Sequence, residues 1–209
     1  MIKDLQIIKK LESRFGWFYY KLKNNEVTKL KLSFKEVKNE DLKLIGELTS
    51  LKVLWLDYNQ ITTIHSLNKL VNLQELHLND NQISKIQGLD KLTNLQMLWL
   101  SYNKISKIEG LDKLTNLERL WFNHNNITEM QGLDKLTKLI ELHLPENKIT
   151  EIKGLDKLTK LEHLNLSYNQ ITEIQGFDEL TKLKVFYIWS NKKFKIQGLD
   201  KLEKIKVKS

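Results

Sequence analysis

The chain has 209 residues, of which 41% are hydrophobic and 29% charged, and its formal net charge is +8. The hydrophobic content is sufficient for a core, and the lack of cysteine excludes both a disulfide framework and a thiolate metal site. No segment approaches the roughly 18 apolar residues of a membrane helix, so we expect no membrane span. The positive net charge favours an anionic partner, which could be nucleic acid, an acidic protein or an anionic membrane.

The chain begins with a segment of helical periodicity. Ile2, Leu5, Ile8 and Leu11 predict a short amphipathic helix over residues 2–14. The segment lacks the apolar run and small-residue cleavage site of a signal peptide. We therefore expect a cytoplasmic protein.

Aromatic residues follow this helix in the stretch FGWFYYKL. We expect the stretch to cap the first strand of the fold. Phe15, Trp17 and Phe18 are interpreted as part of the cap core rather than as a binding site. The N-terminal helical cap is placed at residues 1–26.

A 22-residue repeat fills most of the remaining chain. The clearest unit reads L-x-x-L-x-L-x-x-N-x-I from Leu95 to Ile105, and seven units match this pattern. A degenerate unit precedes them and has Lys35 where the asparagine belongs, while the seventh unit has Lys193 in place of isoleucine. The leucines, asparagines and glycines recur at this step, with leucine at 51, 73, 95, 117, 139, 161 and 183, asparagine at 59, 81, 103, 125, 147, 169 and 191, and glycine at 88, 110, 132, 154, 176 and 198.

This pattern resembles the 22-residue class of leucine-rich repeats over residues 27–204. The class includes the bacterial internalins and a regulatory subunit of type-1 protein phosphatase, and members of both bind proteins on the concave side. The resemblance implies an α/β fold, a right-handed solenoid with a parallel concave sheet and short 3₁₀ or extended turns on the convex side. Residues 205–209 are expected to form an end strand or tail.

Elementary geometry supports the same architecture. Leucines two residues apart point to one face of a strand, and leucines three residues apart, as at Leu111, Leu114 and Leu117, suit a tight helical turn. One such unit cannot cover its own apolar face, but stacked neighbours can. We expect each repeat asparagine to bond backbone groups of the turns and to serve the scaffold.

If the leucines face the core, the residue between them must face solvent on the concave side. Aromatic and imidazole side chains gather in this column and its neighbours, which hold four of the five tryptophans and four of the five histidines. The candidate partner-binding residues are Trp55, Tyr58, Glu75, His77, Met97, Trp99, Tyr102, Arg119, Trp121, His124, Glu141, His143, His163, Tyr168, Tyr187 and Trp189.

An exposed aromatic surface of this kind more often marks an interaction site than a purely structural feature. Trp, Tyr and Arg also contribute most of the binding energy in protein interfaces. We therefore predict a non-enzymatic scaffold that binds a protein or peptide. Cross-strand stacking that only stabilises the sheet is one alternative. Others are carbohydrate or small-molecule binding on the tryptophans, and self-association into a homodimer.

Charge on the concave columns narrows the choice of partner. These columns hold three basic and seven acidic residues, which gives them a net charge of −4. Nucleic acid is therefore disfavoured as a ligand of the concave side. A partner with basic groups could meet both the carboxylates and the indole faces. The acidic residues are Asp57, Glu75, Asp80, Glu118, Glu141, Glu146 and Glu162, and the basic residues are Lys52, Arg119 and Lys184.

The sequence shows no catalytic constellation and implies no cofactor. It has no cysteine nucleophile, no G-x-S-x-G motif and no phosphate-cradling glycine loop. Glu141, His143 and His163 form the tightest cluster, for which a weak zinc site is conceivable. We prefer a polar ladder of Arg119, Glu141 and His163, and predict no metal.

Overall fold

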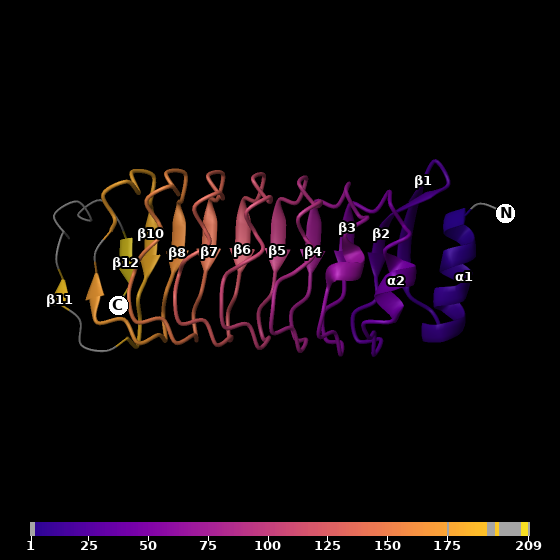
Figure 1. Ribbon diagram of the computed structural model, residues 1–209, viewed down its shortest axis with the longest axis horizontal. Helices are drawn as coiled ribbons and strands as arrows, with labels where there is room; N and C mark the ends of the chain where they lie inside the picture. Colours follow the sequence, from indigo (N-terminus) through magenta and orange to yellow (C-terminus); the bar gives the residue numbers. More distant parts are fainter. Residues whose placement is uncertain (1–2, 175, 192–194, 197–205, 209) are drawn as a thin grey trace.

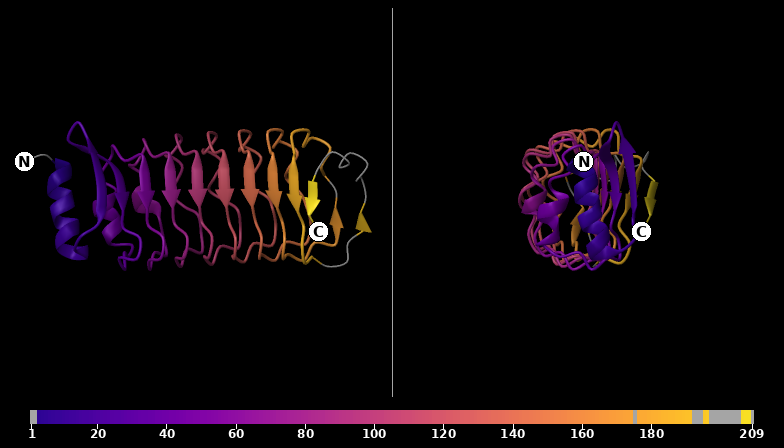
Figure 2. Two further views of the ribbon diagram at one scale, coloured as in Figure 1. Left: turned by 180° about the vertical axis from the view of Figure 1, so that it is seen from behind. Right: turned by 90° about the vertical axis from the view of Figure 1, so that its right-hand side faces the viewer.

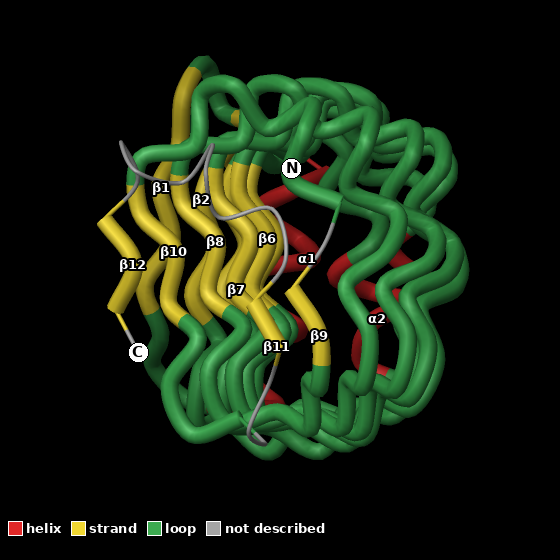
Figure 3. The backbone as a smooth tube through the Cα atoms, turned by 90° about the vertical axis from the view of Figure 1, so that its left-hand side faces the viewer, coloured by secondary structure: helices red, strands yellow, loops and turns green. Residues whose placement is uncertain are grey.

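The computed structural model describes residues 3–174, 176–191, 195–196 and 206–208. Its coils lie side by side in chain order and form an elongated array, with helix α1 at the N-terminal end (Figures 1 and 2). Seen along the long axis, the sheet lies on one side and α2 on the other (Figure 3). Ile2, Lys193 and Gly198, which entered the sequence predictions, lie outside the described residues.

The N-terminal end consists of α1 (Lys3–Phe15) and an antiparallel pair, β1 (Tyr19–Lys23) with β2 (Glu26–Lys31). The predicted helix is thus confirmed, and it buries Ile7, Ile8 and Leu11. Its first turn is tied to the sheet because the Val27 amide donates to Asp4 Oδ2 at 2.8 Å. The domain boundaries at residues 26 and 204 stay predictions.

The aromatic stretch after α1 divides between core and solvent. Phe18 is buried and Phe15 packs partly against the core, as predicted, but the Trp17 side chain is 83% exposed. The prediction that Trp17 belongs to the cap core is therefore wrong. Side chains alternate as the chain extends toward β1, so inward-pointing Phe18 leaves Trp17 and Tyr19 on the outer side.

Each repeat contributes a strand to one sheet. Its order is β1-β2-β3-β4-β5-β6-β7-β8-β10-β12, and every pair after β1–β2 is parallel. The leucine-rich repeat solenoid predicted from the sequence is thereby confirmed. The strands are β3 (Val53–Trp55), β4 (Glu75–His77), β5 (Met97–Trp99), β6 (Arg119–Trp121), β7 (Glu141–His143), β8 (His163–Asn165), β10 (Val185–Tyr187) and β12 (Lys206–Lys208).

The side opposite the sheet is built from tight turns. In the second of the seven matching units, Leu92 N–H donates to the Leu89 carbonyl at 2.8 Å, the bond of a short helical turn. Among the described residues, only η1 (His65–Leu67) forms a 3₁₀ helix. The degenerate unit carries α2 (Asp41–Ile45), and a small separate sheet joins β9 (Glu173–Ile174) to β11 (Lys195–Ile196).

The core is a stack of inward-pointing leucines. Leu54, Leu76, Leu98 and Leu120 lie in register on neighbouring strands and are completely buried. Full burial of such a side chain stabilises the fold by about 1.5–3 kcal/mol. A register slip of one residue would expose all of them, so the alternation of faces is fixed. Within the described residues, no helix is long and apolar enough to cross a bilayer.

The repeat asparagines form the expected ladder. Asn103 donates from Nδ2 to the carbonyls of Leu78 and Leu100, at 2.9 and 3.2 Å. Its Oδ1 accepts the amide hydrogen of Ile83, in the preceding unit, at 2.9 Å. The side chain thus replaces water for backbone groups of two coils, which confirms its scaffold role.

Candidate functional site

The residues between the core leucines form an aromatic stack, which we define as Trp55, His77, Trp99, Trp121 and His143. Successive ring centroids are 5.5, 3.7, 4.6 and 5.9 Å apart. The two central indoles are nearly parallel, with 3° between their planes. The rings point away from the leucine core, as alternation predicts, but each is only half-exposed because its neighbours cover its faces.

A second row of side chains runs three residues further along each unit. We call Phe34, Tyr58, Tyr102, His124 and Tyr168 the edge stripe. Its members have φ between 55° and 58°, in the left-handed region, and all are exposed. Phe34 stacks on Tyr58 with centroids 4.2 Å apart. Sequence reasoning missed Phe34 because the degenerate unit lacks the asparagine that marks this position.

The left-handed backbone of the edge stripe has an energetic cost. A residue with a Cβ loses roughly 1–2 kcal/mol there, whereas glycine adopts the conformation freely. The same position is left-handed in the other units, where it holds Asp80, Glu146 and Ser190, so this cost belongs to the turn of every repeat. What distinguishes the edge stripe is the exposure of its rings, which reaches 49% for Tyr102 and 56% for Tyr168.

The polar column beside the stack is partly paired within the protein. Arg119 Nε lies 3.1 Å from Glu141 Oε1, so two members of the predicted polar ladder meet. Arg119 also approaches the Met97 sulfur at 3.9 Å. His163 is the register neighbour of Glu141 on β8. Among the residues that the structure describes, no group of three or more His, Cys, Asp or Glu side chains is arranged to hold a metal ion.

Several predicted acidic groups already have partners. Glu162 pairs with Lys184 at 2.6 Å, and Glu146 lies 2.7 Å from His124 Nε2. Asp57 accepts the amide hydrogen of Asn79, and its burial raises the pKa of its carboxyl.

Because of these pairings, fewer carboxylates can bind a cationic partner than the seven acidic residues counted in the sequence. The side-chain carboxylates of Glu75 and Glu118 accept no hydrogen bond within the described residues, and Glu75 Oε2 lies 3.8 Å from His77 Nε2. Asp80 hydrogen-bonds Tyr58, and the negative charge of Asp80 raises the pKa of the tyrosine.

The remaining candidates lie toward the C-terminal end of the sheet. Asn165 separates Tyr187 from the aromatic stack within the same column. Trp189 is 46% exposed, and its amide donates to Ser167 Oγ at 3.2 Å. The structure therefore gathers the candidate rings most tightly between β3 and β7, and more loosely beyond them.

His77 is a half-buried titratable group within the stack. Burial between Trp55 and Trp99, with a smaller contribution from the charge of Lys31, lowers its pKa from 6.5 to about 4. Its Nε2 has no hydrogen-bond partner among the described residues, and Glu75 Oε2, at 3.8 Å, is beyond hydrogen-bond distance. The neutral imidazole is thus the form that stacks.

This pKa predicts how stability changes with pH. Because the folded-state pKa of His77 is below the unfolded value, the unfolded chain binds the proton first. The free energy of unfolding should fall by about 3 kcal/mol as the pH drops from 7 to 4. His77→Phe keeps a ring in the stack and should remove that part of the pH dependence, measured by urea unfolding at several pH values. An unchanged pH profile would contradict the assignment.

Parallel strands stacked coil on coil, with one sheet face open to solvent, define this protein as a repeat solenoid. The chain belongs to the leucine-rich repeat family. The family described as leucine-rich repeats (2 copies) matches residues 49–91, 71–113, 93–135, 115–157, 137–179 and 159–204. No curated protein matches the sequence.

Solved structures similar to this chain include proteins from two bacteria. An internalin of Listeria monocytogenes (inlF) is 26% identical with a TM-score of 0.67, over 98% of this chain and 68% of that one. A leucine-rich repeat protein of Leptospira interrogans is 28% identical with a TM-score of 0.67, over 80% of this chain and 51% of that one. Internalin C2 (inlC2) of Listeria monocytogenes is 25% identical with a TM-score of 0.60, over 94% and 93%.

These similarities support a general conclusion about the class. Leucine-rich repeat proteins with the internalin-like fold generally act as protein-binding scaffolds and are typically not enzymes.

Proposed function

We propose that this protein binds a protein or peptide across the sheet face, through the aromatic stack and the edge stripe. The observation that carries the proposal is the edge stripe, whose aromatic rings are exposed to solvent. Cross-strand stacking would explain half-buried rings within the sheet, but it gives no reason for exposed aromatic rings along its edge.

The partner should carry basic groups over the middle of the sheet face. Glu75, Asp80 and Glu118 can accept from lysine or arginine, and the exposed indole edges and tyrosine rings add apolar contact area. Nucleic acid would meet repulsion from the same carboxylates.

The parallel packing of Trp99 and Trp121 argues against the carbohydrate alternative. A sugar ring binds an open aromatic face, and here each indole covers the face of its neighbour at 4.6 Å. Self-association through the sheet face is a separate alternative, and the sedimentation behaviour of the isolated chain tests it.

The direct experiment replaces Trp99 and Trp121 together by alanine. We expect the affinity for an immobilised lysine- and arginine-containing peptide selected by the wild-type chain to fall at least about 30-fold, as for a loss of interface hot spots. Because the indoles stack and are half-buried, the free energy of unfolding should fall by about 1–2 kcal/mol without loss of the fold.

A matched control removes apolar surface elsewhere. Val71 is 42% exposed on a turn outside the strands, so Val71→Ala should leave both peptide binding and folding unchanged. Peptide binding that survives the double substitution would reject the proposed surface. A double variant that fails to fold would instead show that the stack serves the sheet, which favours the purely structural alternative.

A further inference from the structure

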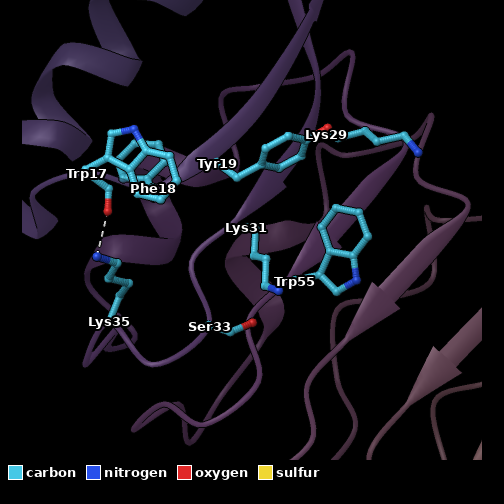
Figure 4. A pocket seen from close by; sticks show the side chains of 8 residues that line it. All are labelled: Trp17, Phe18, Tyr19, Lys29, Lys31, Ser33, Lys35 and Trp55. Atoms are coloured by element: carbon cyan, nitrogen blue, oxygen red, sulfur yellow. Dashed lines mark hydrogen bonds between the residues drawn. The ribbon is translucent and has the colours of Figure 1, made fainter.

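A pocket of about 670 Å³ lies at the N-terminal end of the sheet face, where the cap meets the first strands. Aromatic side chains and lysines line it together (Figure 4). Its walls come from the segment before β1 and from β1, β2, the turn after β2, and β3. The lining residues are Trp17, Phe18, Tyr19, Lys29, Lys31, Ser33, Lys35 and Trp55.

The pocket is continuous with the aromatic stack. In the parallel register of β2 and β3, Lys29 is opposite Val53 and Lys31 is opposite Trp55, the first ring of the stack. Figure 4 shows Lys31 beside this indole, with Tyr19 above it. A chain lying along the sheet face can therefore reach the pocket without turning away from the surface.

The charge of the sheet face reverses at this end. Lys29 and Lys31 stand on β2 in the two columns that carry Glu75 and the stack on later strands. Within the described part of the chain, neither lysine forms an ion pair with a carboxylate. These cations are available to an outside group, and the columns become acidic only from β4 onward.

The backbone that carries the exposed indole of Trp17 is bound to the first coil. Lys35 occupies the position of the missing repeat asparagine and donates from Nζ to the carbonyls of Phe15 and Trp17, at 3.2 and 2.6 Å. These bonds hold the main chain at the rim of the pocket, while the Trp17 side chain is 83% exposed. An exposed indole beside ammonium groups that form no ion pair suits a ligand that is both anionic and apolar.

We propose that this pocket binds an acidic segment of the protein partner, with an aromatic residue among glutamates or aspartates. The inference rests on the proposed function, because it assigns the partner one acidic end over β1–β3 and basic groups over the strands beyond. Charge complementarity sets both the occupant and its direction along the sheet. The carboxylates pair with Lys29 and Lys31, and the aromatic residue packs against Trp17 and Tyr19.

The test uses a fluorescein-labelled peptide of sequence GEEFEEG and measures its anisotropy with the full chain at 150 mM salt. We expect saturable binding that weakens at least about tenfold in Lys29→Glu/Lys31→Glu and in Trp17→Ala. A control variant, Lys91→Glu/Lys113→Glu, makes the same charge change on the turns opposite the sheet and should bind like wild type. Thermal unfolding checks that all variants fold.

The outcomes separate the two proposals. The Trp99 and Trp121 double alanine variant should lose the basic peptide and still bind GEEFEEG. Basic-peptide binding that survives this substitution would contradict only the proposed function of the stack, because the binding of GEEFEEG tests the pocket separately. Equal weakening in the pocket and control charge variants would show attraction to a basic protein in general and would overturn the pocket. It would also be overturned if GEEFEEG fails to bind while Lys29→Glu/Lys31→Glu abolishes self-association, because the occupant would then be a second copy.

Discussion

Replacing Asn125 with alanine is expected to lower the free energy of unfolding by about 3–5 kcal/mol. Asn125 Nδ2 donates to the carbonyls of Leu100 and Phe122 at 2.9 and 3.1 Å, and its Oδ1 accepts the amide hydrogen of Ile105 at 2.9 Å. The side chain is buried, so water cannot replace these bonds at once. The substitution leaves polar backbone groups of two coils unpaired in the middle of the array.

The central position of Asn125 in the array increases the effect of the substitution on stability. Each coil contacts only its neighbours, so a defect in a central unit weakens the coupling between the two halves of the solenoid. Urea unfolding followed by tryptophan fluorescence and by far-ultraviolet circular dichroism should show the lower midpoint. Divergence of the two probes would indicate that the halves then unfold separately.

Asn116 provides the matched control for this asparagine. It is partly open to solvent, and its Nδ2 donates to the Thr93 carbonyl at 2.7 Å in an exposed bond. Asn116→Ala should cost less than about 1 kcal/mol because water replaces the lost partner. If the two alanine variants lose the same free energy, the asparagine ladder does not carry the stability assigned to it.

The period of the sequence was sufficient to predict the solenoid, because leucine spacing alone decides which side chains face inward. Leu98 and Leu100 must lie on the same face of the strand, and the same apolar spacing recurs in every neighbouring unit. The same logic placed Trp99 and Trp121 outside the core. It could not reveal how much of each indole is open, since that depends on ring rotation against the next strand.

The N-terminal end shows where periodicity gives no information. Phe34, Lys29 and Lys31 belong to a degenerate unit, and Trp17 precedes the first repeat, so no recurring position identified them as surface groups. Lys35 shows how the fold accommodates the exception, since its ammonium group donates to carbonyls of the cap, whereas a repeat asparagine donates to carbonyls of its own and the preceding coil. Irregular units at the ends of a repeat array must be interpreted residue by residue.

The charge of the sheet face was also only partly predictable. Counting residues gave a net of −4, but the structure pairs Glu141 with Arg119 and Glu162 with Lys184. Ion pairs depend on rotamers as well as on register, which sequence alone does not supply. The resulting pattern is a gradient, basic at β2 and acidic further along, rather than a uniform acidic groove.

A second large effect is expected at Gly132, where alanine should lower the free energy of unfolding by about 3 kcal/mol. The residue has φ of +88°, and an added Cβ would lie 2.1 Å from the Ile108 carbonyl oxygen in the preceding coil. The left-handed backbone contributes about 1 kcal/mol of this cost. The rest comes from separating two coils whose backbones touch at this turn, since the obstacle is a main-chain atom that cannot rotate away.

Gly176 separates the two contributions because it occupies the same position in a later unit. Its φ is +79°, but an added Cβ would meet only the Ile152 carbonyl oxygen at an ordinary 3.8 Å. Gly176→Ala should therefore cost about 1 kcal/mol, the backbone contribution alone. Chemical denaturation of both variants under one set of conditions measures the difference of about 2 kcal/mol. Equal costs would mean that the glycine column is maintained only by the turn conformation, and that close approach of neighbouring coils does not restrict it.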